Sequence, residues 1–227
     1  MKVVVKLGGS IFDPEPSAKR IDGYARVIKA FSKKNQLVVV TGGGSMARKY
    51  IAGARELGAS EAVCDQIGIQ VSRLNARLLA AGLGDSAFPE ILDRLEDLPR
   101  FATSGLIVVM GGLQPGQSTN AAAALAAETI RADLLVNATD VDGVYSADPR
   151  KDPSAKKLDE VTSEELERIL SREGFRAGEY ALMDPLALRI IKRSGIPVRI
   201  VDGQDPSNVE KALHGKRIGT MIVSMKR

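Results

Sequence analysis

The chain has 227 residues, of which 44% are hydrophobic and 26% charged, and its formal net charge is +4. This composition is typical of one globular domain with a substantial core, and the absence of basic runs interleaved with aromatic residues argues against a nucleic-acid partner. The single cysteine, Cys64, excludes an internal disulfide and a cysteine-based metal cluster. Since neither a signal peptide nor a membrane-length apolar run is present, we expect a cytoplasmic protein with no membrane partner.

Strands and helices are predicted to alternate along the first half of the chain. Continuous apolar runs predict buried strands at 3–7, 37–40 and 106–110. Apolar residues at helical spacing predict helices around 21–31, 46–57 and 67–78. We expect Ser45 to cap the second of these helices and Gly58 to end it. The alanine-rich stretch 120–130 is helical by propensity.

The second half continues the alternation. Strands are predicted at 134–138, 141–145, 198–201 and 220–223, with a polar loop around Pro149 and Pro153. Thr162-x-x-Glu165 and Ser207-x-x-Glu210 predict capped helix starts, a third helix is predicted at 187–193, and the lone His214 should lie at a helix end. The fold class predicted is α/β: a single domain over 1–227, built as a three-layer αβα sandwich with a mainly parallel central sheet.

Two glycine-rich segments follow apolar strands. They are Lys6-Leu7-Gly8-Gly9-Ser10 and Thr41-Gly42-Gly43-Gly44-Ser45. Glycine lets backbone N–H groups approach an anion closely, and a following helix N-terminus adds partial positive charge. Two such loops predict two phosphorylated ligands, or one phosphate moving between two sites. The alternative is that both are tight strand-to-helix turns.

Lys6 stands at the end of the first strand, directly before the first glycines. A lysine held on a strand can neutralise the charge of a phosphoryl group in transfer. The chain has no G-x-x-x-x-G-K-[ST] motif and no G-x-G-x-x-G motif after the first strand, so neither a P-loop enzyme nor a dinucleotide-binding protein is indicated. Taken alone, Lys6 is as readily a structural residue.

Further motifs resemble the amino acid kinase superfamily. These are Asp65-x-Ile67-Gly68, Arg73-Leu74-Asn75-Ala76 and the segment 137–149, which contains Val141-Asp142-Gly143-Val144-Tyr145 and Asp148-Pro149. The first two look most like uridylate kinases of the archaeal type. The resemblance covers essentially the whole chain. It implies ATP-dependent phosphorylation of UMP to UDP, with the acceptor nucleotide held by a lobe over about 1–120 and ATP by a lobe over about 121–227.

The resemblance also implies roles for individual residues. The catalytic residues would be Lys6 and Asn120, and the ATP-binding residues Lys6, Gly9, Ser10, Gly44, Arg48, Thr139, Asp140, Tyr145 and Asp148. The UMP-binding residues would be Gly43, Asp65, Leu113, Gln114, Pro115, Gly116, Gln117, Ser118 and Thr119. Without the resemblance, Arg48 could be a solvated helix residue, Asp65 a helix N-terminal aspartate, 113–119 a turn-rich loop and Tyr145 a packed strand residue.

Two departures from the family pattern stand out. Most members carry an aspartate where this chain has Asn120, and an amide keeps the hydrogen bonding but drops the charge. Acetylglutamate kinases have a second lysine near the position of Met183, and its absence agrees with the uridylate kinase branch. The resemblance further implies Mg²⁺ with ATP, bound through phosphate oxygens and water with no protein ligand required, and a homohexamer built as a trimer of dimers.

Two other functions remain open from the residues. One is a different kinase of this scaffold, acting on isopentenyl phosphate or an acyl carboxylate, although His214 lies too late in the chain to serve as the histidine of isopentenyl phosphate kinases. The other is a non-catalytic oxyanion-binding or storage protein, against which Lys6 and the Asp148-Pro149 loop count.

Overall fold

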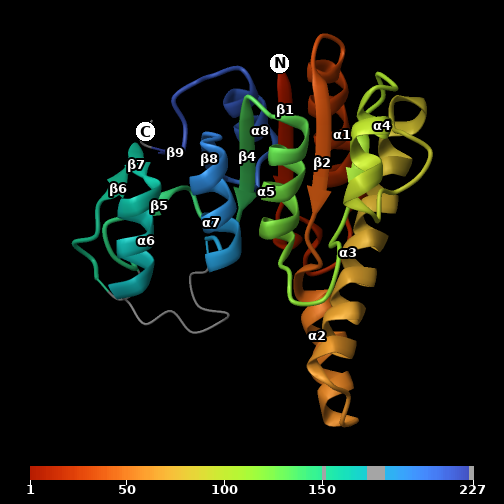
Figure 1. Cartoon of the computed structure of the whole chain (residues 1–227), viewed down its shortest axis with the longest axis horizontal. Helices are drawn as coiled ribbons and strands as arrows, with labels where there is room; N and C mark the ends of the chain where they lie inside the picture. Colours follow the sequence, from red (N-terminus) through yellow and green to blue (C-terminus); the bar gives the residue numbers. More distant parts are fainter. Residues whose placement is uncertain (150–151, 173–181, 225–227) are drawn as a thin grey trace.

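A seven-stranded sheet forms the centre of the molecule (Figure 1). The computed structural model describes residues 1–149, 152–172 and 182–224. The strand order is β3-β2-β1-β4-β8-β9-β7, and all neighbours are parallel except β8 and β9. The strands are β1 (Lys2–Leu7), β2 (Gln36–Thr41), β3 (Val108–Met110), β4 (Leu134–Thr139), β7 (Glu160–Thr162), β8 (Val198–Asp202) and β9 (Thr220–Val223), and β5 (Val144–Tyr145) and β6 (Lys157–Leu158) form a separate antiparallel pair.

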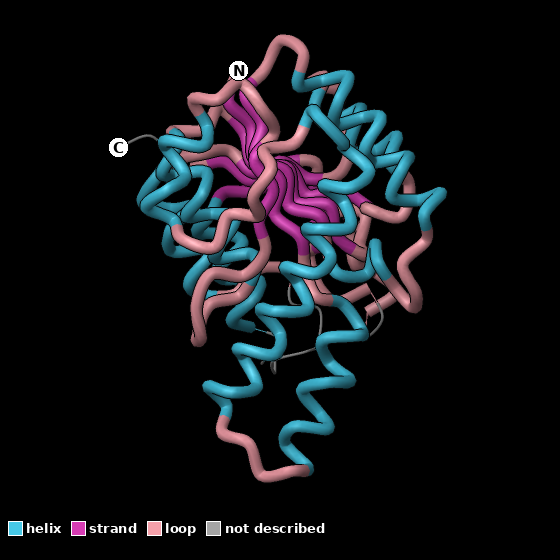
Figure 2. The backbone as a smooth tube through the Cα atoms, turned by 90° about the vertical axis from the view of Figure 1, so that its right-hand side faces the viewer, coloured by secondary structure: helices cyan, strands magenta, loops and turns pink. Residues whose placement is uncertain are grey.

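Helices cover both faces of this sheet, so the predicted three-layer α/β architecture is confirmed (Figure 2). Alternate residues of a strand pack into two separate cores, because successive side chains of a strand point to opposite faces of the sheet. Val4 and Val38 belong to one core, and Val3 and Val39 to the other. The first face is covered by α4 (Leu98–Ala102), α5 (Thr119–Ile130), α6 (Ser163–Arg172) and α7 (Pro185–Ser194), and the second by α1 (Ala18–Ser32), α3 (Glu61–Leu83) and α8 (Pro206–Leu213).

The helices α2 (Gly44–Glu56) and α3 form a hairpin whose far end projects beyond the sheet (Figures 1 and 2). Its apolar residues are therefore only partly buried. Leu74 is 64% exposed and Tyr50 60% exposed, whereas Val71 is buried. The apolar face predicted along α3 is thus only partly covered by the sheet, and part of it is exposed.

Two predicted helix caps are wrong. We expected Ser45 to cap α2, but Gly43 is the N-cap and Ser45 lies within the first turn, where Asp13 accepts hydrogen bonds from it. We expected Ser207 to cap α8, but Asp205 does so by accepting from the Ser207 amide. In both places an aspartate supplies the acceptor that serine was expected to supply.

The capping box at the start of α6 is confirmed, with Glu165 Oε2 2.9 Å from the Thr162 amide and the Glu165 amide 3.1 Å from Thr162 Oγ1. His214 is the C-cap of α8, at the helix end where it was predicted. Within the described residues, no helix combines the length and the apolar character needed to cross a membrane.

Candidate active site

Lys6 is a buried lysine at the carboxyl end of β1. Its neighbours Val5 and Leu7 fill the core under α1 and α3, so Lys6 faces the opposite layer, toward α5 and α7. It is in register with Asn137 of β4, which shares that face, and it is only 8% exposed. Burial lowers the pKa of Lys6 from 10.5 to about 8, while the charges of Asp140 and Asp184 act to raise it. An ammonium in this position has lost most of its water, and among the described residues no carboxylate forms an ion pair with it.

The two predicted glycine loops, residues 8–10 and 42–45, pack against each other backbone to backbone. A Cβ on Gly9 would lie 2.0 Å from the Gly44 nitrogen, and a Cβ on Gly42 would lie 2.5 Å from the Gly9 nitrogen. Gly44 also has φ +67°, which favours glycine. The glycines are therefore needed for the contact between the loops, a reason that the sequence pattern did not reveal.

Backbone amides of both loops meet at this junction. The N–H groups of Gly9, Ser10, Gly43 and Gly44 have no hydrogen-bond partner within the part of the chain that the structure describes. Gly43 and Gly44 stand at the N-terminus of α2, where the helix dipole adds partial positive charge. With Lys6 at the end of the neighbouring strand, the junction can bind the oxygens of phosphate groups.

The second glycine loop is fixed from behind by α3. Asn75 Nδ2 donates to the Gly42 carbonyl at 2.8 Å, and Thr41 Oγ1 donates to the Ser72 carbonyl at 2.8 Å. Both Asn75 and Ser72 are buried. The Arg73-Leu74-Asn75-Ala76 motif therefore contributes at least one residue that positions the loop.

The segment from Gly111 to Ser118, here called the acceptor loop, is also held by α3. Asp65 Oδ2 accepts from the Gly116 amide at 2.8 Å, and Arg73 Nε donates to the Gly112 carbonyl at 3.0 Å. Arg73 Nη2 donates to the Leu113 carbonyl at 3.1 Å. The structure thus brings Asp65 together with the loop that was predicted to hold the acceptor base, although the two are 51 residues apart in sequence.

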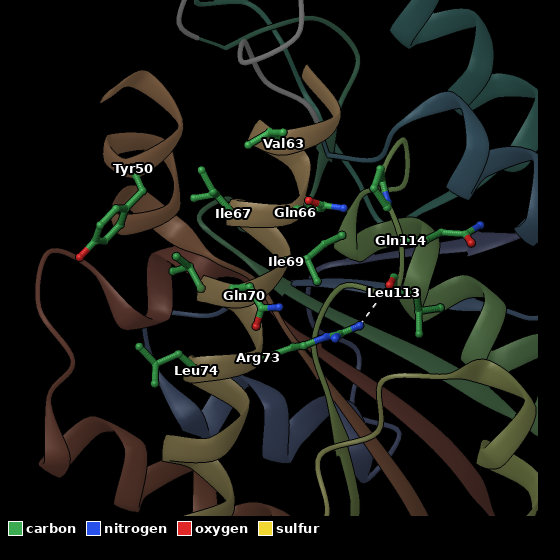
Figure 3. Close-up of a pocket in the computed structure, with 12 residues that line it drawn as sticks. Tyr50, Val63, Gln66, Ile67, Ile69, Gln70, Arg73, Leu74, Leu113 and Gln114 are labelled. Atoms are coloured by element: carbon green, nitrogen blue, oxygen red, sulfur yellow. Dashed lines mark hydrogen bonds between the residues drawn. The ribbon is translucent and has the colours of Figure 1, made fainter. Parts of the chain in front are cut away.

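A pocket of about 850 Å³ lies beside the acceptor loop (Figure 3). Arg73, Ile69, Leu113 and Gln114 line it together with exposed residues of α2 and α3 such as Tyr50. Neither Lys6 nor a glycine of the two loops is among its lining residues. This pocket is therefore distinct from the junction of the two glycine loops.

The residues predicted for ATP follow the end of β4. Thr139 Oγ1 donates to Asp140 Oδ1 at 3.0 Å, and the Thr139 carbonyl accepts from the Gly203 amide. Tyr145 OH donates to Asp142 Oδ1 at 3.0 Å, a hydrogen bond that raises the pKa of Tyr145. Asp148 is buried, at 1% exposure. Asp140 is close enough to Lys6 for its charge to raise the pKa of the lysine, whereas Tyr145 belongs to the small β5–β6 sheet.

Three buried side-chain oxygens have no hydrogen-bond partner among the described residues, namely Gln117 Oε1, Asn120 Oδ1 and Asn137 Oδ1. Asn120 is in the first turn of α5, the helix that covers the Lys6 face, and Asn137 is in register with Lys6. An unpaired buried acceptor is costly, so these oxygens are available to accept hydrogen bonds from a bound molecule.

Two carboxylates at the site were not among the predicted site residues. Asp184 accepts a hydrogen bond from Ser118, the N-cap of α5, and itself caps α7 through the amides of Leu186 and Ala187. The sequence does carry a signal for this second role, since an aspartate before a proline and an apolar run is typical of a helix start. Asp13 pairs with Arg48 at 3.5 Å and carries no such signal.

Comparisons with known proteins show the family to which the chain belongs. The model of the "Amino acid kinase family" matches residues 1–202. A uridylate kinase of Methanothermobacter thermautotrophicus is 48% identical, covering 98% of this chain and 99% of the relative, and one of Methanoculleus marisnigri is 46% identical, covering 97% and 95%. The crystal structure of uridylate kinase from Archaeoglobus fulgidus superposes with a TM-score of 0.90 at 44% identity, covering 98% of this chain and 100% of that one.

Proposed function

The chain belongs to the amino acid kinase family and, within it, to the uridylate kinases, and we propose on this basis which of its residues bind each substrate. Its reaction is the transfer of a phosphoryl group from ATP to UMP. Lys6 and the open amides of the glycine loops hold the phosphate groups, and the acceptor loop holds the nucleoside of UMP. We place the reaction in the cytoplasm, the compartment in which both nucleotide substrates are found.

The observation that carries the proposal is the buried Lys6 beside two glycine loops, four of whose amides have no hydrogen-bond partner among the described residues. The phosphate oxygen of UMP is already anionic and needs no strong general base, so catalysis rests on alignment and charge neutralisation. With a pKa of about 8, Lys6 is mostly protonated at pH 7. Bound phosphates would favour that charged form further.

We assign the two substrates to two sides of the junction. UMP belongs to the lobe over about 1–120, with its phosphate at Gly43, its ribose hydroxyls at Asp65 and its base at 113–119. Asp65 is suited to this task because Oδ2 orders the loop while Oδ1 is left as an acceptor for a hydroxyl. ATP belongs to the lobe over about 121–227, with its phosphates reaching back to Gly9, Ser10, Gly44 and Arg48.

On the ATP side, Thr139, Asp140, Tyr145 and Asp148 would contact the nucleotide. Asp140 follows β4, next to the strand that carries Lys6, so a triphosphate bound there lies within reach of the lysine. Asn120 would accept a hydrogen bond through its unpaired Oδ1, from a ligand or from Lys6. With these assignments, the phosphoryl group would pass from ATP on one side of the glycine loops to UMP on the other.

Mg²⁺ fits this site as an ion that ATP carries. Among the described residues, no three histidine, cysteine, aspartate or glutamate side chains gather as a metal-binding group. The nearest candidates are Asp140 and Asp184, the two carboxylates whose charges act on Lys6. Phosphate oxygens and water would supply the remaining ligands, as Mg²⁺ prefers, and the ion would neutralise phosphate charge.

We propose that the chain assembles as a homohexamer built from dimers. The projecting α2–α3 hairpin supports this, because Leu57 is 89%, Leu74 64% and Val63 42% exposed. Apolar side chains gathered on one exposed hairpin are typical of a protein–protein interface. Closed symmetry then favours assemblies of two-fold pairs.

A coupled ADP-release assay with UMP, CMP and dUMP tests the proposed function. We expect rapid ADP release with UMP, much slower release with the other two, and none without an acceptor. Binding of nucleotide without ADP release would indicate an oxyanion-binding protein instead. Turnover with isopentenyl phosphate or an acyl carboxylate, and not with UMP, would indicate a different kinase of this fold.

A further inference from the structure

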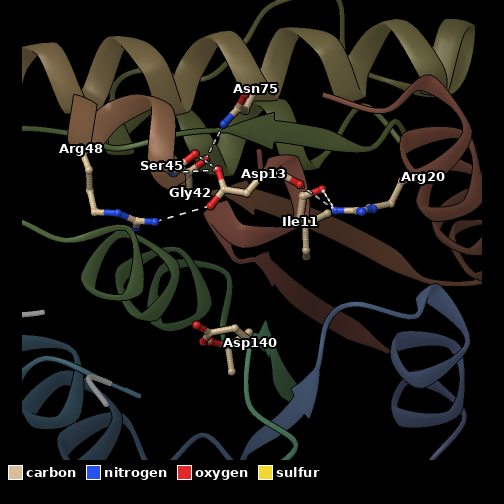
Figure 4. A network of polar contacts seen from close by, with 9 residues as sticks. Ile11, Asp13, Arg20, Gly42, Ser45, Arg48, Asn75 and Asp140 are labelled. Carbon is tan, nitrogen blue, oxygen red and sulfur yellow. Dashed lines mark hydrogen bonds and ion pairs between the residues drawn. The ribbon is translucent and has the colours of Figure 1, made fainter. Parts of the chain in front are cut away.

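Asp13 contacts two residues of α2, Ser45 and Arg48, beside the second glycine loop (Figure 4). It follows the short 3-10 helix Gly9–Phe12 that continues the first loop. We propose that Asp13 is a positioning residue: one of its carboxylate oxygens fixes the first turn of α2, and the other holds Arg48 in place for the phosphates of ATP. This inference rests on the proposed function, in which Arg48 contacts those phosphates.

Asp13 is bonded to the first turn of α2 through Ser45. Asp13 Oδ1 accepts from the Ser45 amide at 2.7 Å and from Ser45 Oγ at 2.7 Å. Charge-assisted hydrogen bonds of this length are about twice as strong as neutral ones. A Cβ on residue 44 would lie 2.5 Å from the same oxygen, so Gly44 is also required for Asp13 to reach the helix.

The second half is the pair with Arg48. Asp13 Oδ2 lies 3.5 Å from Arg48 Nη2, and the Arg48 side chain is 74% exposed whereas that of Asp13 is 21% exposed. An exposed pair of this kind adds little stability. What it does is limit the directions in which a long, solvated guanidinium can point, and a positioned guanidinium loses less entropy when it binds phosphate.

Asp13 is itself held firmly enough to orient a partner. Its backbone carbonyl accepts from Arg20 Nη1 at 3.2 Å, and Arg20 Nη1 also donates to the Ile11 carbonyl at 3.1 Å. Its amide donates to the Ser10 carbonyl at 3.2 Å. Arg20 on α1 thus restrains the backbone of Asp13, and the Asp13 side chain restrains Arg48 on α2.

A double-mutant cycle between Asp13→Asn and Arg48→Ala tests the proposal. Asparagine keeps an oxygen that can accept from Ser45 but loses the charge that holds Arg48. We expect Asp13→Asn to raise the KM for ATP about three- to tenfold with kcat within about twofold, and Arg48→Ala to raise it roughly ten- to hundredfold. In the Arg48→Ala background, Asp13→Asn should then change the KM less than about twofold.

Additive effects of the two substitutions would overturn the proposal, because they would show that Asp13 does not act through Arg48. If Asp13→Asn does not fold, Asp13→Ser takes its place in the same cycle. Asp22→Asn is the control, because it breaks a surface pair with Arg26 (3.1 Å) on α1 away from the site, and it should leave both constants unchanged. If Arg48→Ala raises the KM for UMP instead, the ATP assignment of the proposed function fails. The coupling to Asp13 is then read from the KM for UMP.

Discussion

The burial of Lys6 predicts that the lysine lowers the stability of the free protein while it serves catalysis. Its pKa falls from 10.5 to about 8, which corresponds to about 3 kcal/mol of unfavourable free energy for the charged form in the folded state. Lys6→Met replaces the ammonium with an unbranched apolar side chain of similar length. We therefore expect the variant to be more stable than the wild type by up to about 3 kcal/mol at pH 7.

The same substitution should remove most of the activity. One preorganised charge at a transferring group is worth about 3 kcal/mol in the transition state, so kcat should fall by roughly two or more orders of magnitude with a modest change in KM. Lys6→Ala should lose kcat to the same degree. Lys6→Arg should not restore it, because a planar guanidinium does not fit the space of an ammonium.

The difference in stability between Lys6→Met and the wild type should shrink as the pH rises. Between about pH 8 and 10.5, folded Lys6 has lost its proton while the unfolded chain still binds one, so the stability of the wild type rises with pH relative to that of the variant. The advantage of Lys6→Met should thus be complete below pH 8 and vanish as the pH approaches 10.5. Denaturant unfolding of both proteins across this range measures it.

Lys34→Met is the matched control, since it removes an exposed lysine just before β2, at the opposite end of the sheet. Lys34→Met should leave kcat unchanged, and its stability should depend on pH in the same way as that of the wild type. The reasoning would be refuted if Lys6→Met were less stable than the wild type at pH 7, or if it kept kcat within tenfold.

Three further predictions concern Asn120, the choice of acceptor and the assembly. Asn120→Asp should fold and keep activity within about tenfold, by analogy with family members that have aspartate there; a steep rise in the KM for ATP would mean instead that Asn120 serves to remove negative charge. UMP should be preferred over dUMP and CMP, over dUMP by roughly a thousandfold or more, because Asp65 would otherwise be left without its hydroxyl partner; equal turnover of dUMP and UMP would contradict that role of Asp65. Light scattering at micromolar concentration should give an oligomer, and Leu74→Glu should dissociate it; a monomeric wild type would contradict the assembly.

Local patterns in the sequence determined the secondary structure and revealed the two glycine loops. Apolar runs such as 37–40 predict buried strands because both faces of a central parallel strand are covered. The glycines after β1 and β2, and Lys6 before them, could be recognised because strand, glycine and helix follow each other directly in the chain. The family motifs then led to the assignment of Asp65 and 137–149, which the pattern of apolar residues does not supply.

Only the tertiary structure decided which groups meet. Asp13 reaches Ser45 across 32 residues and Asp65 reaches Gly116 across 51, and no spacing rule links such positions. The cap of α2 was mispredicted for this reason, since the acceptor comes from Asp13 on another segment and not from Ser45. The contact of Gly9 with Gly44 is of the same kind: it depends on two strands lying side by side, and the distance between their ends is set by the sheet.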